Sequence, residues 1–140
     1  MGVVSFPTSI KPKSNCIRRT GEAGTAIAIG EVLALNGSGK LILAQADVVA
    51  ESDVVGVALT TATAAGQPVI YGIGGDVEAA SGLKQGAVYV LSNTPGDVCD
   101  AYGTDLTEDV SRVSTVALGL NATSFRLNIC NSGVVMNFTP

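Results

Sequence analysis

The sequence predicts an all-β fold, a small β-sandwich or barrel of about eight short strands with an extended N-terminal arm. Short runs of Val, Ile and Leu alternate with Gly, Pro and Asn at spacings of roughly 8 to 15 residues, which is typical of strands joined by turns. Hydrophobic residues make up 46% of the 140 residues and aromatic residues only 4%, which favours a thin core of small aliphatic side chains. A chain of this length forms one domain.

The N-terminal residues are predicted to form a separate piece, with the arm at 1–24 and the β-rich body at 25–140. Pro7 and Pro12 bias their neighbours toward extended geometry and exclude a continuous helix. Such a leader is either a flexible end or an arm that becomes ordered on a partner. The residues expected to make that contact are apolar and basic: Val3, Val4, Phe6, Ile10, Lys11, Lys13, Arg18 and Arg19.

The charge distribution singles out the same segment. The net charge is −4, but four of the eight basic residues precede the first acid, Glu22. A basic segment on an acidic body predicts docking on an acidic partner. Four cations over about twenty residues are too sparse for a nucleic-acid patch, so no nucleic-acid partner is expected.

The body begins with a clear hairpin signal. Two aliphatic runs, at 31–35 and 40–44, flank Asn-Gly-Ser-Gly, whose residues accept positive φ. Further on, 112–120 and 124–130 are predicted to form the best-defined pair of strands, and alternation places Phe125, Leu127 and Ile129 on one face. Other strands are expected at 54–60, 68–73, 76–79 and 87–91.

Residues 92–109 are predicted to be one long loop that carries five acids. Calcium takes six to eight oxygen ligands from flexible loops, but the acids here do not have the EF-hand spacing. A solvated acidic loop is the plainer interpretation, and calcium binding is left open. The five acids are Asp97, Asp100, Asp105, Glu108 and Asp109.

The chain lacks the residues that most catalytic and metal-binding sites require. The chain has no His, which excludes Ser–His–Asp and Cys–His nucleophile systems. Cys16, Cys99 and Cys130 lack the CxxC spacing of zinc sites and are expected to be free thiols. We therefore expect no enzyme, no cofactor and no bound metal.

Two patterns invite a chemical interpretation and are better explained by structure. Residues 37–40, Gly-Ser-Gly-Lys, resemble part of a phosphate loop, but Ala34 and Leu41 stand where that motif requires Gly and Ser or Thr. They are therefore predicted to be a hairpin turn. Asp76 and Glu78 share one face of a strand, as a glycosidase pair could, but two acids on a solvated strand are commoner.

No apolar run approaches the roughly 18 residues that a membrane-spanning helix needs, so no membrane partner is expected. Pro7 and Lys11 interrupt any signal-peptide core, which predicts synthesis in a cytoplasm.

Four phrases of the sequence resemble a known kind of structural module. They read G-x-V-L at 30–33, V-G-V-A-L at 55–59, A-G-Q-P-V at 65–69 and Y-x-L-S-x-T-P-G at 89–96. Together the chain is similar, over roughly residues 21–130, to the capsid decoration (cement or head-stabilising) proteins of tailed bacteriophages and to related head-fibre β-modules.

That resemblance implies a virion protein seated on the outer surface of an icosahedral head. It implies a homotrimer that bridges capsomers and resists the pressure of packaged DNA, with the N-terminal arm bound to the major capsid protein. No catalytic residue is carried over. The candidates for the trimer contact are also candidates for the core: Phe125, Leu127, Ile129, Val135 and Phe138.

An alternative stays within the virion. A fibre or tail component could bind a host glycan through its β-domain, and glycan sites usually use exposed aromatic side chains. The chain offers Tyr71, Tyr89 and Tyr102 for that role.

Overall fold

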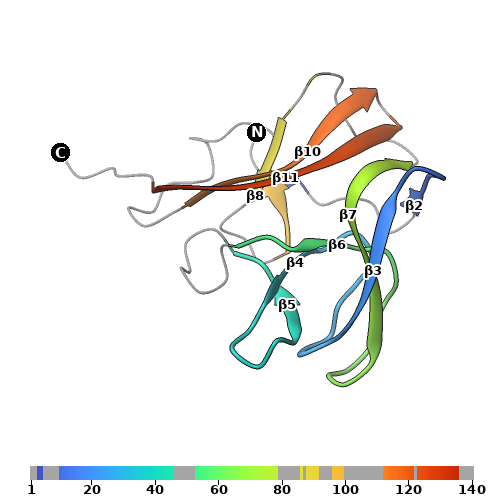
Figure 1. The fold of residues 1–140 in the computed structure, drawn as a ribbon, viewed down its shortest axis with the longest axis vertical. Coiled ribbons are helices and arrows are strands. Elements are labelled where there is room, and N and C mark those ends of the chain that lie inside the picture. Colours follow the sequence, from blue (N-terminus) through green and yellow to red (C-terminus); the bar gives the residue numbers. More distant parts are fainter. Residues whose placement is uncertain are drawn as a thin grey trace.

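The computed structural model describes residues 3–4, 10–45, 53–78, 86, 88–91, 96–99, 112–121 and 123–135. Within this part of the chain every regular element is a β-strand, which confirms the all-β fold class (Figure 1). The strands form a curled antiparallel sheet, as expected of a small barrel or sandwich. None of the described residues belongs to a helix that could cross a membrane.

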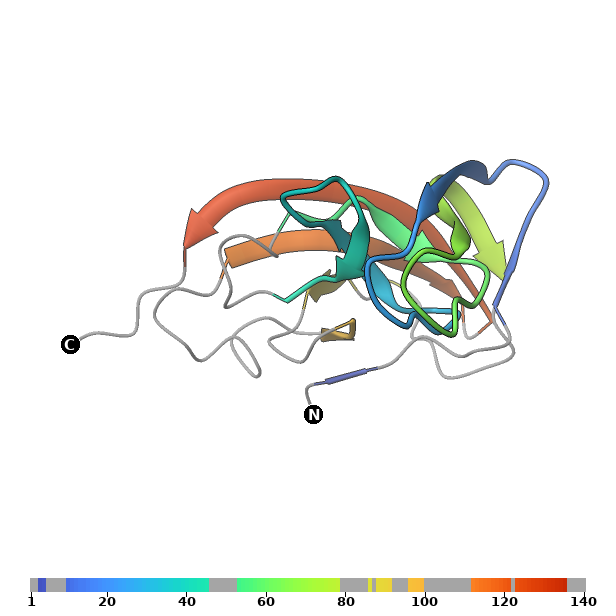
Figure 2. The ribbon, with the colours of Figure 1, turned by 90° about the horizontal axis from the view of Figure 1, so that it is seen from below.

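The strands pair in the order β1-β9-β8-β10-β11-β7-β6-β4-β5, and β2 and β3 also pair with β7. Figure 2 shows β10 and β11 as a long curved layer with β3 and β7 at one end of it. The strand bounds are β1 (Val3–Val4), β2 (Lys11–Pro12), β3 (Ile17–Glu22), β4 (Val32–Leu35), β5 (Leu41–Leu43), β6 (Gly56–Ala58), β7 (Pro68–Glu78), β8 (Val88–Leu91), β9 (Val98–Cys99), β10 (Arg112–Asn121) and β11 (Ser124–Val135).

Strand β7 connects the two parts of the sheet. Residues 68–74 pair with β3, and 75–78 pair with β11. The two separate strands predicted at 68–73 and 76–79 are therefore one strand. Gly75, at a φ of 82°, allows the chain to bend there without ending the ladder.

The described residues contain two clusters of buried residues, and β4 contributes to both, with Val32 and Ala34 in one and Leu33 in the other. Both consist mainly of small aliphatic side chains, as the composition predicts. The large core contains Ile10, Cys16, Val32, Ala34, Ala44, Val54, Val57, Leu59, Val77, Tyr89, Val90, Leu91, Val98, Val116, Ala117, Phe125 and Leu127. The small core contains Ala23, Ile27, Leu33, Leu41, Ala58, Ala62 and Val69.

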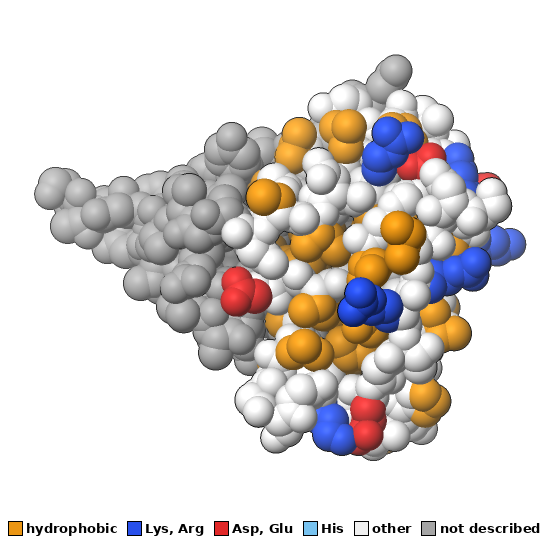
Figure 3. All heavy atoms as spheres, viewed as in Figure 1, with side chains coloured by type: hydrophobic (Ala, Val, Ile, Leu, Met, Phe, Trp, Pro, Cys, Tyr) orange, Lys and Arg blue, Asp and Glu red, His pale blue; other side chains and the backbone are white. Residues whose placement is uncertain are grey.

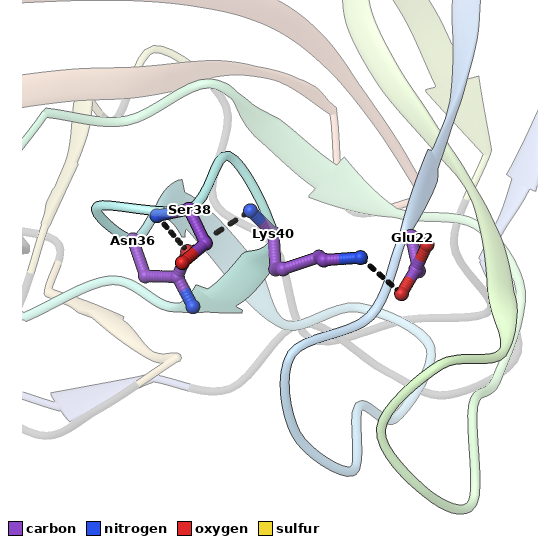
Figure 4. A network of polar contacts seen from close by, with 4 residues as sticks. All are labelled: Glu22, Asn36, Ser38 and Lys40. Atoms are coloured by element: carbon purple, nitrogen blue, oxygen red, sulfur yellow. Dashed lines mark hydrogen bonds and ion pairs between the residues drawn. The ribbon is translucent and has the colours of Figure 1, made fainter.

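The hairpin of β4 and β5 confirms the turn predicted between them. The Asn36 side-chain oxygen accepts hydrogen bonds from the main-chain N–H groups of Ser38 (2.9 Å) and Lys40 (3.0 Å). Gly39 has a φ of 77°, which glycine adopts readily. The Lys40 ammonium forms an ion pair with Glu22 on β3, so the hairpin tip is tied to the end of that strand (Figure 4).

The C-terminal pair of strands is also confirmed, since β10 and β11 pair from Arg112–Val135 to Asn121–Ser124. The loop predicted at 92–109 is wrong in one part, because β9 pairs there with β8 and β1. A two-residue strand is too short to produce a periodic pattern. Of the five acids in that region, Asp97 is described and the other four lie outside the described residues.

A candidate binding edge on strand β3

The described residues of the predicted arm belong to the sheet. β3 pairs with β7 over six residues, and Ile10 and Cys16 are 4% and 7% exposed in the large core. Ile10 and Cys16 therefore pack into the body on the other side of the boundary predicted at residue 24, whereas Ile17 stays exposed. Of Val3 and Val4 only the backbone is described, paired with β9, and Phe6 lies outside the described residues.

Polar contacts fix the turn between β2 and β3. The Lys13 ammonium donates to the hydroxyl of Ser124 (3.0 Å), and the Lys13 main-chain N–H donates to the carbonyl of Asp76 (3.0 Å). The Asp76 N–H in turn donates to the side-chain oxygen of Asn15 (3.2 Å). Lys13 is therefore a structural anchor between the N-terminal segment, β7 and β11.

Asp76, one of the two acids considered from the sequence as a pair, forms an ion pair with an arginine. Arg126, the cross-strand neighbour of Asp76, donates from its Nε to the Asp76 carboxylate at 2.9 Å. That hydrogen bond holds the pKa of Asp76 below its ordinary value of 3.8. A carboxyl group that stays ionised does not suit the role of general acid.

Strand β3 buries neither of its faces at its N-terminal end. Ile17, Arg18, Arg19 and Thr20 are all exposed, although successive residues point to opposite faces of a strand. Figure 3 shows Lys and Arg side chains along the side of the molecule that carries β3. Arg18 and Arg19 have no hydrogen-bond or ion-pair partner in the described part of the chain, so both charges are available to a ligand.

One edge of β3 is open as well. The Ile70 N–H donates to the Thr60 hydroxyl (2.9 Å), and its carbonyl accepts from the Leu59 N–H (2.8 Å). Both polar groups of Ile70 thus point away from Thr20, its neighbour on β3. Since pairing alternates along an antiparallel ladder, the N–H and C=O of Thr20, and of Arg18, point away from β7.

The open edge ends where the chain leaves β3. The Gly24 N–H donates to the carbonyl of Leu41 (2.7 Å), and Ala23 forms a bridge with the same residue of β5. Residues 17–20 are the stretch of β3 that no other described strand covers. We refer to this stretch as the β3 edge.

Apolar side chains flank the β3 edge. Ile17 is 58% exposed, and Ile70, beside Thr20, is 39% exposed. Tyr71, the neighbour of Arg19, is half-buried against the small core. The site therefore combines two cations, apolar surface and open main-chain groups, which is the chemistry of a protein-binding surface.

The trimer-contact candidates on β11 face inward. Phe125 and Leu127 are 0% and 5% exposed in the large core, and Ile129 packs against that core. For these three the interpretation as core residues holds. Of Val135 only the strand backbone is described, and Phe138 lies outside the described residues.

The cysteines, metal ligands and tyrosines considered from the sequence do not come together in one site among the described residues. Cys16 is buried and Cys130 exposed, both as free thiols, and burial raises the pKa of Cys16. The described residues contain no group of three His, Cys, Asp or Glu that could hold a metal ion. Tyr89 is 1% exposed and cannot stack on a sugar, whereas Tyr71 is partly accessible and Tyr102 lies outside the described residues.

Comparison of the chain with known protein families finds no match, and comparison with curated proteins finds none of significant similarity.

Proposed function

We propose that this chain is a structural protein of a tailed-phage virion, which binds the outside of the icosahedral head and stabilises the shell. In this proposal it acts as a homotrimer that bridges neighbouring capsomers. The phrases at 30–33, 55–59, 65–69 and 89–96 support the kind of module. The observation that carries the docking role is the pair Arg18 and Arg19, exposed and without partners in the described structure.

In this proposal the N-terminal segment is part of the folded body and not a detached arm, and its residues have two different roles. Ile10 and Lys13 hold the N-terminal segment on the body, through the large core and through Ser124. Arg18 and Arg19 then present positive charge from a fixed strand to acidic groups on the shell. Fixing the strand in advance lowers the entropy lost on binding, because the docking surface is ordered before contact. In a trimer, three such surfaces raise the avidity.

The test uses purified heads that lack the protein. Wild-type chain is added, and its copy number relative to the major shell protein is measured by quantitative mass spectrometry. We expect saturation at a large simple fraction of the shell protein. The double variant Arg18→Gln and Arg19→Gln should bind at least about tenfold more weakly, with a smaller dependence on salt.

A matched control distinguishes the loss of the binding site from the change in net charge. Thr25 and Thr61 are exposed and lie outside the β3 edge, so Thr25→Glu with Thr61→Glu makes the same change of two charges elsewhere. This control should bind as the wild type does. Only a handful of wild-type copies per head, or none, would contradict the proposed function.

A further inference from the structure

We propose that the β3 edge accepts a β-strand from an acidic extended segment of the partner, paired through the backbone of Arg18 and Thr20. The identity of that partner as the shell protein rests on the proposed function. The pairing itself rests on the geometry of β3 and does not depend on it.

The main-chain groups on the open edge of β3 are free to pair with a further strand. The N–H and C=O of Arg18 and Thr20 point away from β7, since Ile70 uses its own polar groups on Leu59 and Thr60. These four groups have the spacing at which a further strand hydrogen-bonds. An edge of this kind is a template for pairing unless charge, a bulge or a covering segment blocks it. The irregularity of the β3 ladder lies between Ile17 and Arg18, before the stretch that would pair, and the charges of Arg18 and Arg19 oppose a basic strand but attract an acidic one.

The side chains select the partner's chemistry. Arg18 and Arg19 are consecutive, so they present one cation on each face of β3. A partner strand places its own residues directly opposite, at about 4.5–5.5 Å between Cβ atoms. Two consecutive acids in that strand would therefore meet one cation each. Exposed Ile17 favours an apolar residue one position further along.

A second copy of this chain is a poorer occupant. Pairing two β3 strands would gather four arginines at one interface, and like charges across a ladder are destabilising. Glu22 could offset one of them, but it is already paired with Lys40. The acidic foreign strand is favoured by charge complementarity.

The first experiment uses the unmodified full-length chain and measures hydrogen exchange by NMR. The probe is an eight-residue peptide with blocked ends, two central Glu and flanking Val and Thr. Without peptide, the amides of Arg19 and Gly21 should be protected and those of Arg18 and Thr20 should exchange fast. With peptide, Arg18 and Thr20 should become protected, and a peptide with two central Lys should have no effect.

The second experiment removes one outward N–H. Thr20→Pro should weaken peptide binding about tenfold, because proline cannot donate there, whereas the ladder to β7 keeps its bonds. Thr20→Val keeps the N–H and should bind within about twofold of the wild type. Equal binding by Thr20→Pro and Thr20→Val would overturn the proposal.

The outcomes separate this inference from the proposed function. Wild-type binding to heads without peptide protection of Arg18 and Thr20 would overturn the strand pairing and leave the function standing. Peptide protection without head binding would do the reverse. Protection of the same amides that grows with protein concentration, without peptide, would show that a second copy is the occupant and overturn the acidic foreign strand.

Discussion

Gly75 is the residue at which β7 changes partners, and no larger residue fits there. Its φ is 82°, and a Cβ atom built on it would lie 2.2 Å from the carbonyl oxygen of Asn15. We expect Gly75→Ala to lower the free energy of unfolding by about 2–4 kcal/mol, from backbone strain and displacement of the Asn15 turn. Urea unfolding measures the change.

The adjacent glycine provides the control. A Cβ on Gly74 would lie 3.5 Å from the Ile17 Cδ1, an ordinary contact, and Gly74 does not have a positive φ. Gly74→Ala should therefore cost less than about 1 kcal/mol. Equal losses for the two variants would show that the bend at Gly75 does not depend on glycine.

Asp76 should make stability depend on pH in the acidic range. The hydrogen bond from Arg126 lowers the pKa of Asp76 in the folded chain below its ordinary value of 3.8. Ionised Asp76 therefore stabilises the folded chain fully when the pH is above 3.8. That contribution is lost as the pH falls through the folded pKa. Asp76→Asn should be less stable than the wild type at pH 6, and the difference should shrink below about pH 4.

The measurement is urea unfolding of both proteins across that range. Asp53→Asn, at an exposed position, serves as the comparison for removing an acid. A wild-type advantage over Asp76→Asn that persisted unchanged at the lowest pH would contradict the assignment to ionised Asp76.

At the scale of elements, the β4–β5 hairpin depends on one side chain. Asn36→Ala removes the acceptor of two turn hydrogen bonds, from Ser38 and Lys40, and should cost about 1 kcal/mol. Ser38→Ala leaves the Ser38 main-chain donor in place and should cost less. Thermal unfolding followed by circular dichroism compares the two, and a Ser38→Ala loss as large as that of Asn36→Ala would be contrary evidence.

How far each element could be predicted depends on whether its pairing is local. The hairpin at Asn36 and the pair β10–β11 join neighbouring strands through short turns, so turn residues and alternation identify them. β3 has no such signal, because its partner β7 lies about fifty residues further along and its side chains Ile17–Thr20 do not alternate. The sequence therefore predicts Arg18 and Arg19 as binding residues, but it does not predict that they lie on a strand paired with β7.

The continuity of β7 was missed for a related reason. In the sequence Gly74 and Gly75 predict the end of a strand, since glycine weakens strand patterns. In the structure they are where the strand bends toward β11. Local composition cannot distinguish a bend from an end, since the difference lies in the distant strands that complete the ladder.

In the molecule as a whole, we expect the N-terminal segment to be needed for folding. Deleting residues 1–20 would remove Ile10 and Cys16 from the large core and most of β3 from the ladder of β7. We expect this deletion to abolish cooperative unfolding. Deleting residues 1–9 removes the pairing of β1 with β9 and should leave a less stable but cooperative fold. Chemical denaturation tests both, and comparable stability of the two truncated chains would restore the idea of a detached arm.

The position of β7 also bears on the order in which the chain can fold during synthesis. β3, β4, β5 and β6 all precede β7, so its first half has every partner available once residue 78 is made. Its second half pairs with β2 on one side, but on the other side it must wait for Ser124–Leu127 of β11, up to 49 residues later, since 127 − 78 = 49. At about 5–20 residues per second, the ribosome needs about 2–10 s for that stretch. For those seconds the new chain carries an unpaired strand edge beside an otherwise formed half, and such an edge is a template for incorrect pairing with another chain.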